Sequence, residues 1–209
     1  MEIIKIDLDN PDQKVIKNAA DILRRGGVVV YPTDTAYGLG VNALEEKAIK
    51  KVYEIKGRNF SKPTHAIVRD WKMIKELCFA NDTVKKLYEY FLPGPLTIIL
   101  LKKKVVPDIL TAGLTTLGIR IPNNQVTNLL SNQLTIPYTT PSANREGGKT
   151  PYSIDEVKKE LDIQKIDLVL DAGQLPSTPP STIVDLTTTP IKIIREGPIS
   201  KEKISSAVM

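Results

Sequence analysis

The sequence of 209 residues contains one cysteine, Cys78, and one histidine, His65. A lone thiol cannot form a disulfide within the chain, and scarcity of cysteine is typical of proteins from a reducing compartment. Zinc sites draw three or four ligands mainly from cysteine and histidine side chains. One chain therefore cannot build a His/Cys zinc cage, and we predict no resident metal ion.

Long hydrophobic runs are also missing. No apolar stretch reaches the length of about 20 residues that a membrane-spanning helix needs. The first residues, Met1 to Lys5, lack the basic region and the long apolar stretch of a signal peptide. We therefore predict a soluble, cytoplasmic protein with no membrane partner.

Aromatic side chains are the third scarce group, at 5% of the residues. RNA-binding domains stack bases on such rings, so the composition offers little for this mode of recognition. Basic side chains are in excess and give a formal charge of +5. That excess favours anionic partners such as nucleotides or RNA, although we expect most individual lysines on the solvated surface.

The remaining composition is that of a globular protein, with 41% hydrophobic and 25% charged residues. The length suits one large domain better than two domains with separate cores. We therefore predict a single domain over residues 1–209.

Apolar residues recur at helical spacing in some segments and form short strand-like runs in others. Helices are predicted over 15–23, 48–56 and 84–91, and an amphipathic segment begins near Ser200. Strands are predicted over 28–31, 66–68, 96–101, 117–121, 136–140, 166–170, 182–186 and 191–194. This pattern predicts an α/β fold with a twisted, mixed sheet flanked by helices. No helical pattern separates the later strands, so we expect that part of the sheet to be largely antiparallel, and Pro176 to Pro180 to form a loop.

Two segments imitate nucleotide-binding loops. In the first, Gly38 to Ala43, a polar stretch separates the glycines from the preceding strand, whereas a dinucleotide-binding loop starts at the strand end. We interpret this segment as a tight strand-to-helix turn. The second, Ala143 to Thr150, matches a P-loop except for alanine at the first glycine, and 166–171 resembles the strand that accompanies one. Because Pro151 follows at once, a degenerate P-loop using Lys149 is kept only as a minor alternative.

Arg120 interrupts the otherwise apolar strand 117–121. A buried arginine needs an anionic partner, and its planar guanidinium suits a carboxylate. The sequence leaves open whether that carboxylate belongs to the protein or to a ligand. Small polar and basic residues gather at four further strand ends. These groups are Thr33 to Thr35, Lys56 with Arg58 and Lys62, Thr140 to Asn144, and Arg195.

Seven motifs, in order along the chain, resemble those of the YrdC-like proteins, the threonylcarbamoyl-adenylate synthases. They are Tyr31 to Leu39, Lys56 to Arg58 with Lys62-Pro63, Leu92 to Thr97, Gly118 to Pro122, Pro141 to Asn144, Ser181 to Asp185, and Ile194 to Gly197. The resemblance runs from about Val15 to Ser200. Longer relatives add a C-terminal domain, so this chain resembles the short form of the family.

The resemblance implies a twisted sheet with a large, positively charged concave surface. It implies the conversion of L-threonine, bicarbonate and ATP to threonylcarbamoyl-AMP and pyrophosphate, with Mg²⁺ accompanying ATP. A separate tRNA threonylcarbamoyl transferase would consume the product, and the protein itself could contact tRNA or double-stranded RNA.

The resemblance also implies roles for individual residues, with Lys56 and Arg58 expected to be catalytic by cradling the phosphates. The residues expected around ATP are Lys56, Arg58, Lys62, Thr116, Ser142, Asn144, Thr150 and Arg195. Those expected around threonine are Thr33, His65, Arg120, Thr140 and Ser181. Arg120 is expected to bind the threonine carboxylate, whereas His65 is open to a role as a base or in packing.

Two alternatives to the synthase remain from the sequence. One is a non-catalytic module that binds double-stranded RNA or tRNA through the same basic concavity. The other is a carbamoyl-adenylate enzyme like those of hydrogenase maturation, although those proteins carry zinc-finger and acylphosphatase parts that have no counterpart here.

Overall fold

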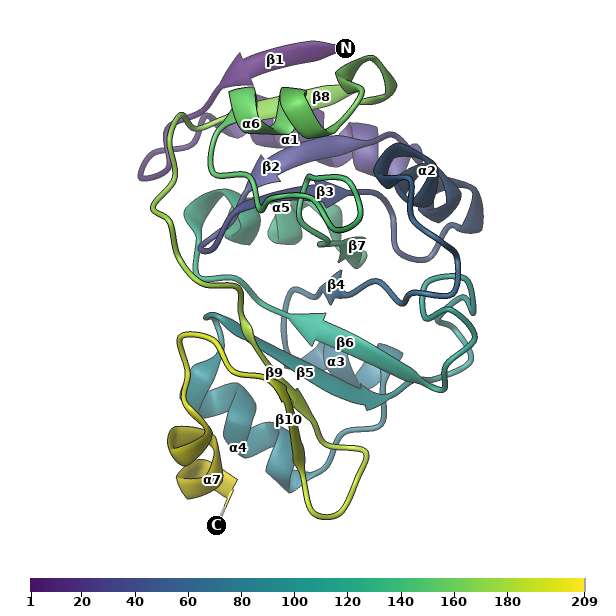
Figure 1. Cartoon of the computed structure of the whole chain (residues 1–209), viewed down its shortest axis with the longest axis vertical. Helices are drawn as coiled ribbons and strands as arrows, with labels where there is room; N and C mark the ends of the chain where they lie inside the picture. Colours follow the sequence, from purple (N-terminus) through teal and green to yellow (C-terminus); the bar gives the residue numbers. More distant parts are fainter. Residues whose placement is uncertain (209) are drawn as a thin grey trace.

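The computed structural model describes residues 1–208 and confirms a mixed α/β fold (Figure 1). The helices are α1 (Gln13–Arg24), α2 (Glu46–Lys56), α3 (Trp71–Leu77), α4 (Asp82–Phe91), α5 (Gln125–Leu134), α6 (Ile154–Glu160), the short 3₁₀ helix η1 (Ile163–Lys165) and α7 (Lys201–Val208). The strands are β1 (Glu2–Lys5), β2 (Val29–Pro32), β3 (Tyr37–Gly40), β4 (Ala66–Ile67), β5 (Leu96–Leu101), β6 (Thr116–Arg120), β7 (Tyr138–Thr139), β8 (Leu168–Asp171), β9 (Thr182–Asp185) and β10 (Lys192–Arg195).

The strands divide between two mixed sheets. The four-stranded sheet has the order β1-β8-β2-β3, in which β8 runs parallel to both neighbours and β2 and β3 are antiparallel. The six-stranded sheet has the order β10-β9-β5-β6-β4-β7. In it β5 is antiparallel to β6 and parallel to β9, while β9 and β10 are antiparallel. The predicted mixture of parallel and antiparallel pairing is therefore present in both sheets.

The two sheets meet along a seam where residues 37–43 run beside residues 137–143. Backbone hydrogen bonds join Leu39 N to Pro141 O at 2.9 Å and Thr139 N to Val41 O at 3.0 Å. The hydroxyl of Thr139 reinforces the seam, since it accepts from Val41 N and donates to Leu39 O. Backbone groups that would be left unpaired at two sheet edges thus satisfy each other.

Side chains of β2 alternate between two faces of the four-stranded sheet, as the strand period requires. Val29 and Tyr31 pack in one hydrophobic cluster with α1 and α5, whereas Val28 and Val30 belong to a cluster that includes α2 and α6. This sheet is therefore buried on both faces, which explains why 28–31 is an uninterrupted apolar run.

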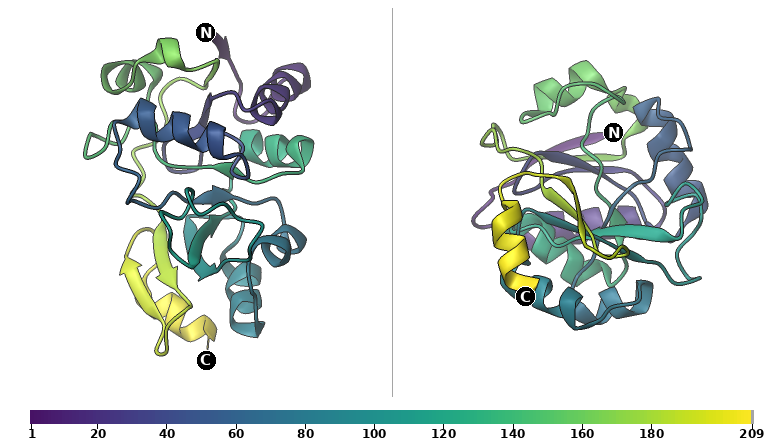
Figure 2. Two further views of the ribbon diagram at one scale, coloured as in Figure 1. Left: turned by 90° about the vertical axis from the view of Figure 1, so that its right-hand side faces the viewer. Right: turned by 60° about the horizontal axis from the view of Figure 1, so that its bottom comes forward.

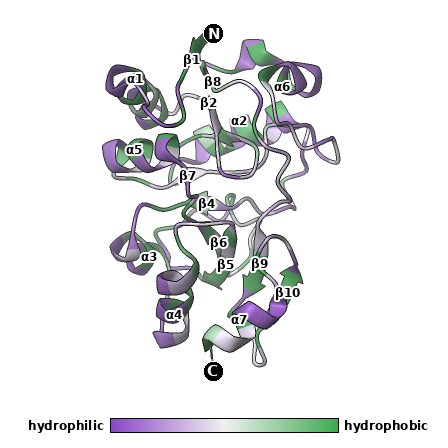
Figure 3. Ribbon diagram, turned by 90° about the vertical axis from the view of Figure 1, so that its left-hand side faces the viewer, coloured by the Kyte–Doolittle hydropathy of each residue, from purple (hydrophilic) through white to green (hydrophobic). Residues whose placement is uncertain are grey.

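The six-stranded sheet is asymmetric. Leu96, Ile98 and Leu100 of β5 pack with α3 and α4, whereas Thr97 and Arg120 extend from the opposite face. Figure 3 shows hydrophobic residues along β5 and β6, with hydrophilic residues on the outer faces of the helices. The chain begins beside the four-stranded sheet and ends at the opposite pole, next to α7 (Figures 1 and 2). None of the helices within residues 1–208 combines the length and the apolar character that crossing a bilayer requires.

The predicted helices near 15–23, 48–56, 84–91 and 200 correspond to α1, α2, α4 and α7. The prediction that no helices separate the later strands was wrong, since α5 and α6 lie between them. Both are short helices that begin at side-chain caps: Asn124 accepts from Thr127 N, and Ser153 forms a capping box with Glu156. β1 and α3 were also not predicted, whereas residues 176–180 form a loop as expected.

The predicted strand-to-helix turn at 38–43 is wrong in its first half, because Tyr37–Gly40 is the strand β3. Its glycines are required by close packing on the buried ring of Tyr31. A Cβ on Gly40 would lie 2.7 Å from Tyr31 Cε1, and one on Gly38 would lie 3.0 Å from Tyr31 Cζ. The glycines therefore let β3 lie against an aromatic ring and do not form a phosphate-binding turn.

We predict that Gly40→Ala lowers the free energy of unfolding by about 1–3 kcal/mol, because the added methyl overlaps a ring that has no room to move. Urea denaturation measures this loss. In a Tyr31→Leu background the ring is absent, so Gly40→Ala should lower the free energy of unfolding less. The difference between the two losses should be at least about 0.5 kcal/mol. Equal losses in both backgrounds would contradict the proposed contact.

Candidate functional site

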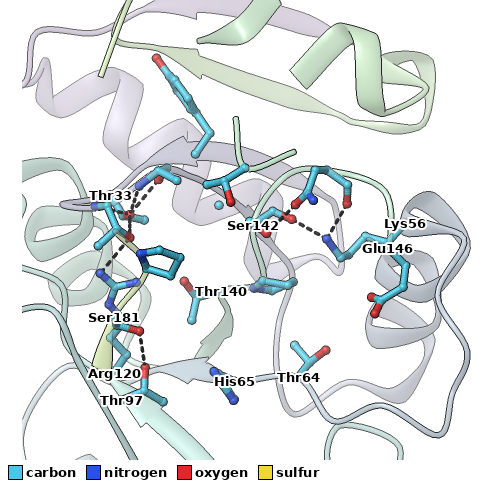
Figure 4. Close-up of a pocket in the computed structure, with 18 of the residues that line it drawn as sticks. Thr33, Lys56, Thr64, His65, Thr97, Arg120, Thr140, Ser142, Glu146 and Ser181 are labelled. Atoms are coloured by element: carbon cyan, nitrogen blue, oxygen red, sulfur yellow. Dashed lines mark hydrogen bonds between the residues drawn. The ribbon is translucent and has the colours of Figure 1, made fainter. Parts of the chain in front are cut away.

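A cavity of about 310 Å³ lies between the two sheets (Figure 4). Its walls include the β2–β3 turn, the end of α2 with the loop that follows, the face of the six-stranded sheet that bears Thr97 and Arg120, and the segment 140–147. Both sheets and the loops between them contribute, so the cavity exists only where the two halves of the fold meet. Its volume falls within the range of small-molecule sites, about 300–1,000 Å³.

Arg120 stands at the end of β6, with its side chain 8% exposed. One terminal nitrogen donates to Asp34 Oδ1 at 2.5 Å and to Thr35 Oγ1 at 3.0 Å. The other carboxylate oxygen of Asp34 accepts from Asn123 N at 3.1 Å. The protein carboxylate considered in the sequence is therefore present, and it fixes one edge of the guanidinium. Both of these bonds use the same terminal nitrogen, and the buried Nε of Arg120 has no hydrogen-bond partner within residues 1–208.

The hydroxyl of Thr33 shapes the β2–β3 turn. It accepts from the backbone N–H groups of Thr35 and Ala36, both at 3.1 Å, and donates to Ala36 O at 2.7 Å. Threonine is well suited to such turns because its hydroxyl replaces backbone partners. Thr33 therefore contributes first to the conformation of the wall that carries Asp34 and Thr35.

Ser181 and Arg195 form a second polar group at the lower wall. Arg195 donates from Nε and a terminal nitrogen to Ser181 O at 3.0 and 2.8 Å. The Ser181 hydroxyl lies 2.9 Å from the hydroxyl of Thr97. Burial and the neighbouring Arg120 lower the pKa of Arg195, so two guanidinium groups share this end of the cavity.

Lys56 is the last residue of α2 and is only 3% exposed. Its ammonium donates to Ser142 O and Asn144 O, both at 2.5 Å. Within this segment the Ser142 hydroxyl donates to Asn144 Oδ1, and Asn144 Nδ2 donates to Gly148 O at 2.8 Å. Burial, and next the charge of Arg58, lower the pKa of Lys56 to about 8. The amine is therefore still mostly charged near neutral pH while it holds the 142–144 segment.

Gly57 ends α2 in a left-handed conformation, with φ of 57°. The next residue, Arg58, begins the loop that lines the cavity. Arg58 donates to Pro63 O at 2.9 Å, and its Nε lies 3.4 Å from Glu146 Oε2. Lys62 binds the other oxygen of Glu146 at 2.6 Å. This second ion pair links the loop after α2 to the segment 144–147.

His65 lies on the floor of the cavity, against β6. A Cβ on Gly118 would meet the imidazole ring at 2.5 Å, so only glycine allows this approach. The carbonyl of His65 accepts from Thr140 N at 3.1 Å, which places the Thr140 side chain at the same wall. Burial, followed by the charges of Arg195, Arg58 and Arg120, lowers the pKa of His65 to about 4. The imidazole is thus neutral at physiological pH.

The cavity is strongly cationic. Its basic lining side chains are Lys56, Arg58, Arg120, Arg145 and Arg195. Glu146 is the single acidic side chain among the lining residues. Such an arrangement attracts polyanions and carboxylates. Within residues 1–208 no group of three or more His, Cys, Asp or Glu side chains is placed to hold a metal ion.

The structure brings most of the predicted site residues to this one cavity. The predicted residues that line it are Thr33, Lys56, Arg58, His65, Arg120, Thr140, Ser142, Asn144, Thr150, Ser181 and Arg195. Lys62 is exposed outside the lining but reaches it through Glu146. Thr116 does not line the cavity, because it begins β6 while Arg120 ends it, about 13 Å apart along the strand.

The P-loop alternative is contradicted by the topology. The segment 144–150 follows β7 of the six-stranded sheet, whereas the supposed companion strand is β8 of the four-stranded sheet. A P-loop wraps phosphates at the start of the helix that it enters, but here Pro151 and the cap Ser153 separate Thr150 from α6. Lys149 is exposed and does not line the cavity.

Sequence reasoning missed Glu146, Thr64, Thr97 and Arg145 as lining residues. Thr97 could have been found, because it alternates with Leu96 and Ile98 and so had to face away from the core. The Glu146 side chain could not, because its position depends on the contact between two loops 84 residues apart in the sequence.

The fold and the cavity define a mixed α/β protein with a cationic small-molecule site between two sheets. The Sua5/YciO/YrdC family, described as telomere recombination, matches residues 21–197. A Methanocaldococcus jannaschii protein, provisionally named a threonylcarbamoyl-AMP synthase, is 42% identical over 206 residues, which are 98% of this chain and 97% of the relative. The chain belongs to the Sua5/YciO/YrdC family.

Two solved structures have the same fold. Pyrococcus abyssi Sua5 in complex with L-threonine superposes with a TM-score of 0.93 at 33% identity, covering 98% of this chain and 60% of that protein. Escherichia coli YciO superposes with a TM-score of 0.87 at 30% identity, covering 97% and 98%. The chain thus spans little more than half of Sua5 and nearly all of YciO.

The environment of His65 predicts a titration that is simple to observe, since it is the single histidine. NMR of the tag-free chain should give a pKa of about 4 for its imidazole. Arg195→Gln should raise the pKa of His65, because Arg195 is the charged neighbour that lowers this pKa most. Lys149→Ala should leave the pKa unchanged. A value near 6.5 in the parent protein would contradict the cationic surroundings.

The same shift predicts a contribution to stability. Between pH 6.5 and about 4, His65 is protonated in the unfolded chain but neutral in the folded chain. The free energy of unfolding therefore decreases as the pH falls through this range. Urea denaturation across this range, compared with His65→Gln, isolates the histidine contribution.

Proposed function

We propose that the protein is a threonylcarbamoyl-AMP synthase, which converts L-threonine, bicarbonate and ATP to threonylcarbamoyl-AMP, pyrophosphate and water. The observation that carries the proposal is the cavity in which Arg120 and Ser181 lie across from Lys56 and Ser142 (Figure 4). Arg195, which is bonded to Ser181, and Arg58 line the same cavity. Such a cavity can hold an amino acid carboxylate and a polyphosphate side by side. The family membership and the relatives named for this activity support the same proposal.

At the amino acid end, Arg120 binds the carboxylate of threonine. Asp34 and Thr35 hold one terminal nitrogen, which fixes the direction of the guanidinium, while Nε remains without a partner. Pre-orientation of this kind lowers the entropy lost on binding. Arg195 is the second cation at this end, so a bound carboxylate would relieve the repulsion between two guanidinium groups.

The remaining amino acid contacts come from residues with defined local roles. Thr33 shapes the turn, Ser181 is held by Arg195, and Thr140 lies on the wall beside His65. The Thr33 hydroxyl is fully used within the turn, so we assign Thr33 to shaping this wall of the threonine site. We assign the hydroxyls of Ser181 and Thr140 and the imidazole to recognition of the amino and hydroxyl groups of threonine. Polar partners for the hydroxyl would reject valine, because valine would leave them unpaired. A pKa of about 4 makes His65 a weak base, so we assign it a hydrogen-bonding role.

At the nucleotide end, Lys56, Arg58 and Lys62 neutralise the phosphates. Two of the three ammonium hydrogens of Lys56 are used by Ser142 O and Asn144 O, which leaves one for a phosphate oxygen. Ser142, Asn144 and Thr150 form the wall at this end. The Ser142 hydroxyl and the Asn144 amide donate within the segment, so a phosphate that binds them would replace these bonds. Arg195 lines the same cavity and contacts the nucleotide from the wall that carries Ser181, whereas Thr116 lies outside the cavity and receives no role.

The reaction needs alignment more than covalent catalysis. The amino group of threonine forms an N–C bond with bicarbonate, and water leaves, giving a carbamate. A carbamate oxygen then forms a bond to the α-phosphorus as the bond to pyrophosphate breaks. Positioned cations stabilise the charge that develops on the phosphate oxygens and on the leaving group. Lys56 and Arg58 are therefore the residues to which we assign catalysis.

Mg²⁺ would enter with ATP, held by phosphate oxygens, because the described residues offer no cluster of metal ligands. A tRNA threonylcarbamoyl transferase would consume the product, so we place the protein in the cytoplasm with tRNA. The non-catalytic RNA-binding alternative requires RNA affinity that falls steeply with salt and no threonine-dependent turnover of ATP.

We predict that Arg120→Ala weakens threonine binding by about 2–4 kcal/mol, because a charge-paired carboxylate contact is lost. Calorimetry with threonine measures this change, and Lys149→Ala, which alters an exposed lysine outside the cavity, is the control. Because Arg120→Ala alone leaves Asp34 without its partner, the double variant Arg120→Ala/Asp34→Asn should retain the defect in a folded chain. Normal threonine affinity in both variants would refute the assignment of Arg120.

We predict that ATP yields AMP-linked product and pyrophosphate only when threonine and bicarbonate are both present. Mass spectrometry with ¹³C-bicarbonate should place the label in threonylcarbamoyl-AMP. Lys56→Ala and Arg58→Ala should chiefly reduce the nucleotide step, while Lys149→Ala should remain active, in contrast to a P-loop enzyme. Turnover with carbamoyl phosphate in place of threonine and bicarbonate would favour the hydrogenase-maturation alternative.

A further inference from the structure

Glu146 places a carboxylate at the phosphate-binding end of the cavity (Figure 4). Its Oε1 accepts from Lys62 Nζ at 2.6 Å, and its Oε2 lies 3.4 Å from Arg58 Nε. The hydrogen bond from Lys62, and then the charge of Arg58, hold the pKa of Glu146 below its usual range. The carboxylate is therefore ionised at neutral pH and is bound to two of the three cations assigned to the phosphates.

The backbone directs this carboxylate to its place. Glu146 N donates to Lys56 O at 3.0 Å, and the Lys56 ammonium holds the preceding residues through Ser142 O and Asn144 O. Lys62 and Arg58 belong to the loop that follows α2. The ion pairs thus connect two loops at the rim of the cavity, and they are the contacts there that a charged ligand can replace without disturbing the backbone.

A phosphate oxygen and the carboxylate of Glu146 need the same donors. Lys62 already makes a short bond to the carboxylate, whereas the contact from Arg58 lacks hydrogen-bond geometry, and its Nε has no hydrogen-bond partner within residues 1–208. A polyphosphate that binds Arg58 and Lys62 must therefore take them from Glu146. Its apparent affinity is lowered by the fraction of molecules in which the carboxylate occupies them.

We propose that Glu146 is an internal anion of the synthase, which competes with the polyphosphate chain for Lys62 and Arg58. A ligand with several phosphate charges displaces it, and the carboxylate returns to the two cations when pyrophosphate leaves. Glu146 thereby weakens product retention in a cavity whose other charged lining groups are all cationic. This inference rests on the proposed function, because it takes Lys62 and Arg58 as phosphate ligands.

Calorimetry of Glu146→Gln with ATP and with inorganic pyrophosphate tests the inference. Both ligands should bind roughly 2- to 10-fold more tightly, as expected when one or two partly exposed ion pairs no longer compete. Tighter binding cannot result from a damaged fold, so it separates competition from a merely structural role. Glu89→Gln removes the same charge from an exposed pair with Lys85 on α4, and its affinities should match those of the parent.

Two further measurements make the test specific. In a Lys62→Met background the gain from Glu146→Gln should shrink, because the strongest partner is absent. AMP lacks the departing phosphates, so its affinity should change less than that of pyrophosphate. Unchanged or weaker pyrophosphate binding by Glu146→Gln, or an equal gain for AMP, would overturn the inference. If the parent protein bound neither ATP nor pyrophosphate, the proposed function itself would fail instead.

Discussion

The buried ammonium of Lys56 is the contact on which the site depends. It ends α2 and donates to two carbonyls of the segment 142–144, of which Ser142 O also accepts from Asn144 N at 2.9 Å. The same segment carries Ser142 and Asn144, and Glu146 follows from a backbone bond to Lys56 O. One side chain therefore sets the geometry of a wall and also contributes its charge to the cavity. Removing it would alter both, so a loss of activity at this position reports on scaffold and chemistry together.

Concentrated positive charge is costly for the folded chain, and the structure limits this cost locally. Asp34 compensates Arg120 on the wall behind the cavity, and Glu146 compensates Arg58 and Lys62 at the rim. His65 remains neutral among three guanidinium groups. What remains uncompensated faces the cavity, where a substrate would supply the missing anions. Binding energy and relief of repulsion therefore come from the same groups, as is common where function and stability compete.

The sequence predicted those parts that depend on local pattern. The run 28–31 is buried on both faces, and 96–101 and 117–121 are strongly apolar, so their strands were evident. The helices α5 and α6 are short and begin at Asn124 and Ser153. Because asparagine and serine are equally common in loops, the sequence did not predict these helices. The partition into two sheets could not be predicted, because it depends on the seam between residues 37–43 and 137–143, which are far apart in the chain. For the site, most of the residues identified by motif resemblance line the cavity. The position of Glu146 depends on the approach of two loops, and Thr116 lies on the same face of β6 as Arg120 but at its other end.

The seam also has a mechanical consequence. The cavity is bounded by two sheets that are joined by backbone hydrogen bonds along this seam. The hydroxyl of Tyr31 donates to Thr139 O next to these bonds. A ligand that contacts both Arg120 and the segment 142–144 would connect the two sheets across the seam. The spacing of the two walls, and hence the fit of any ligand, is then governed by buried residues such as Thr139 and Tyr31 that never meet the ligand. Substitutions at these interior positions would change which substrates fit, even with every cationic side chain of the cavity retained.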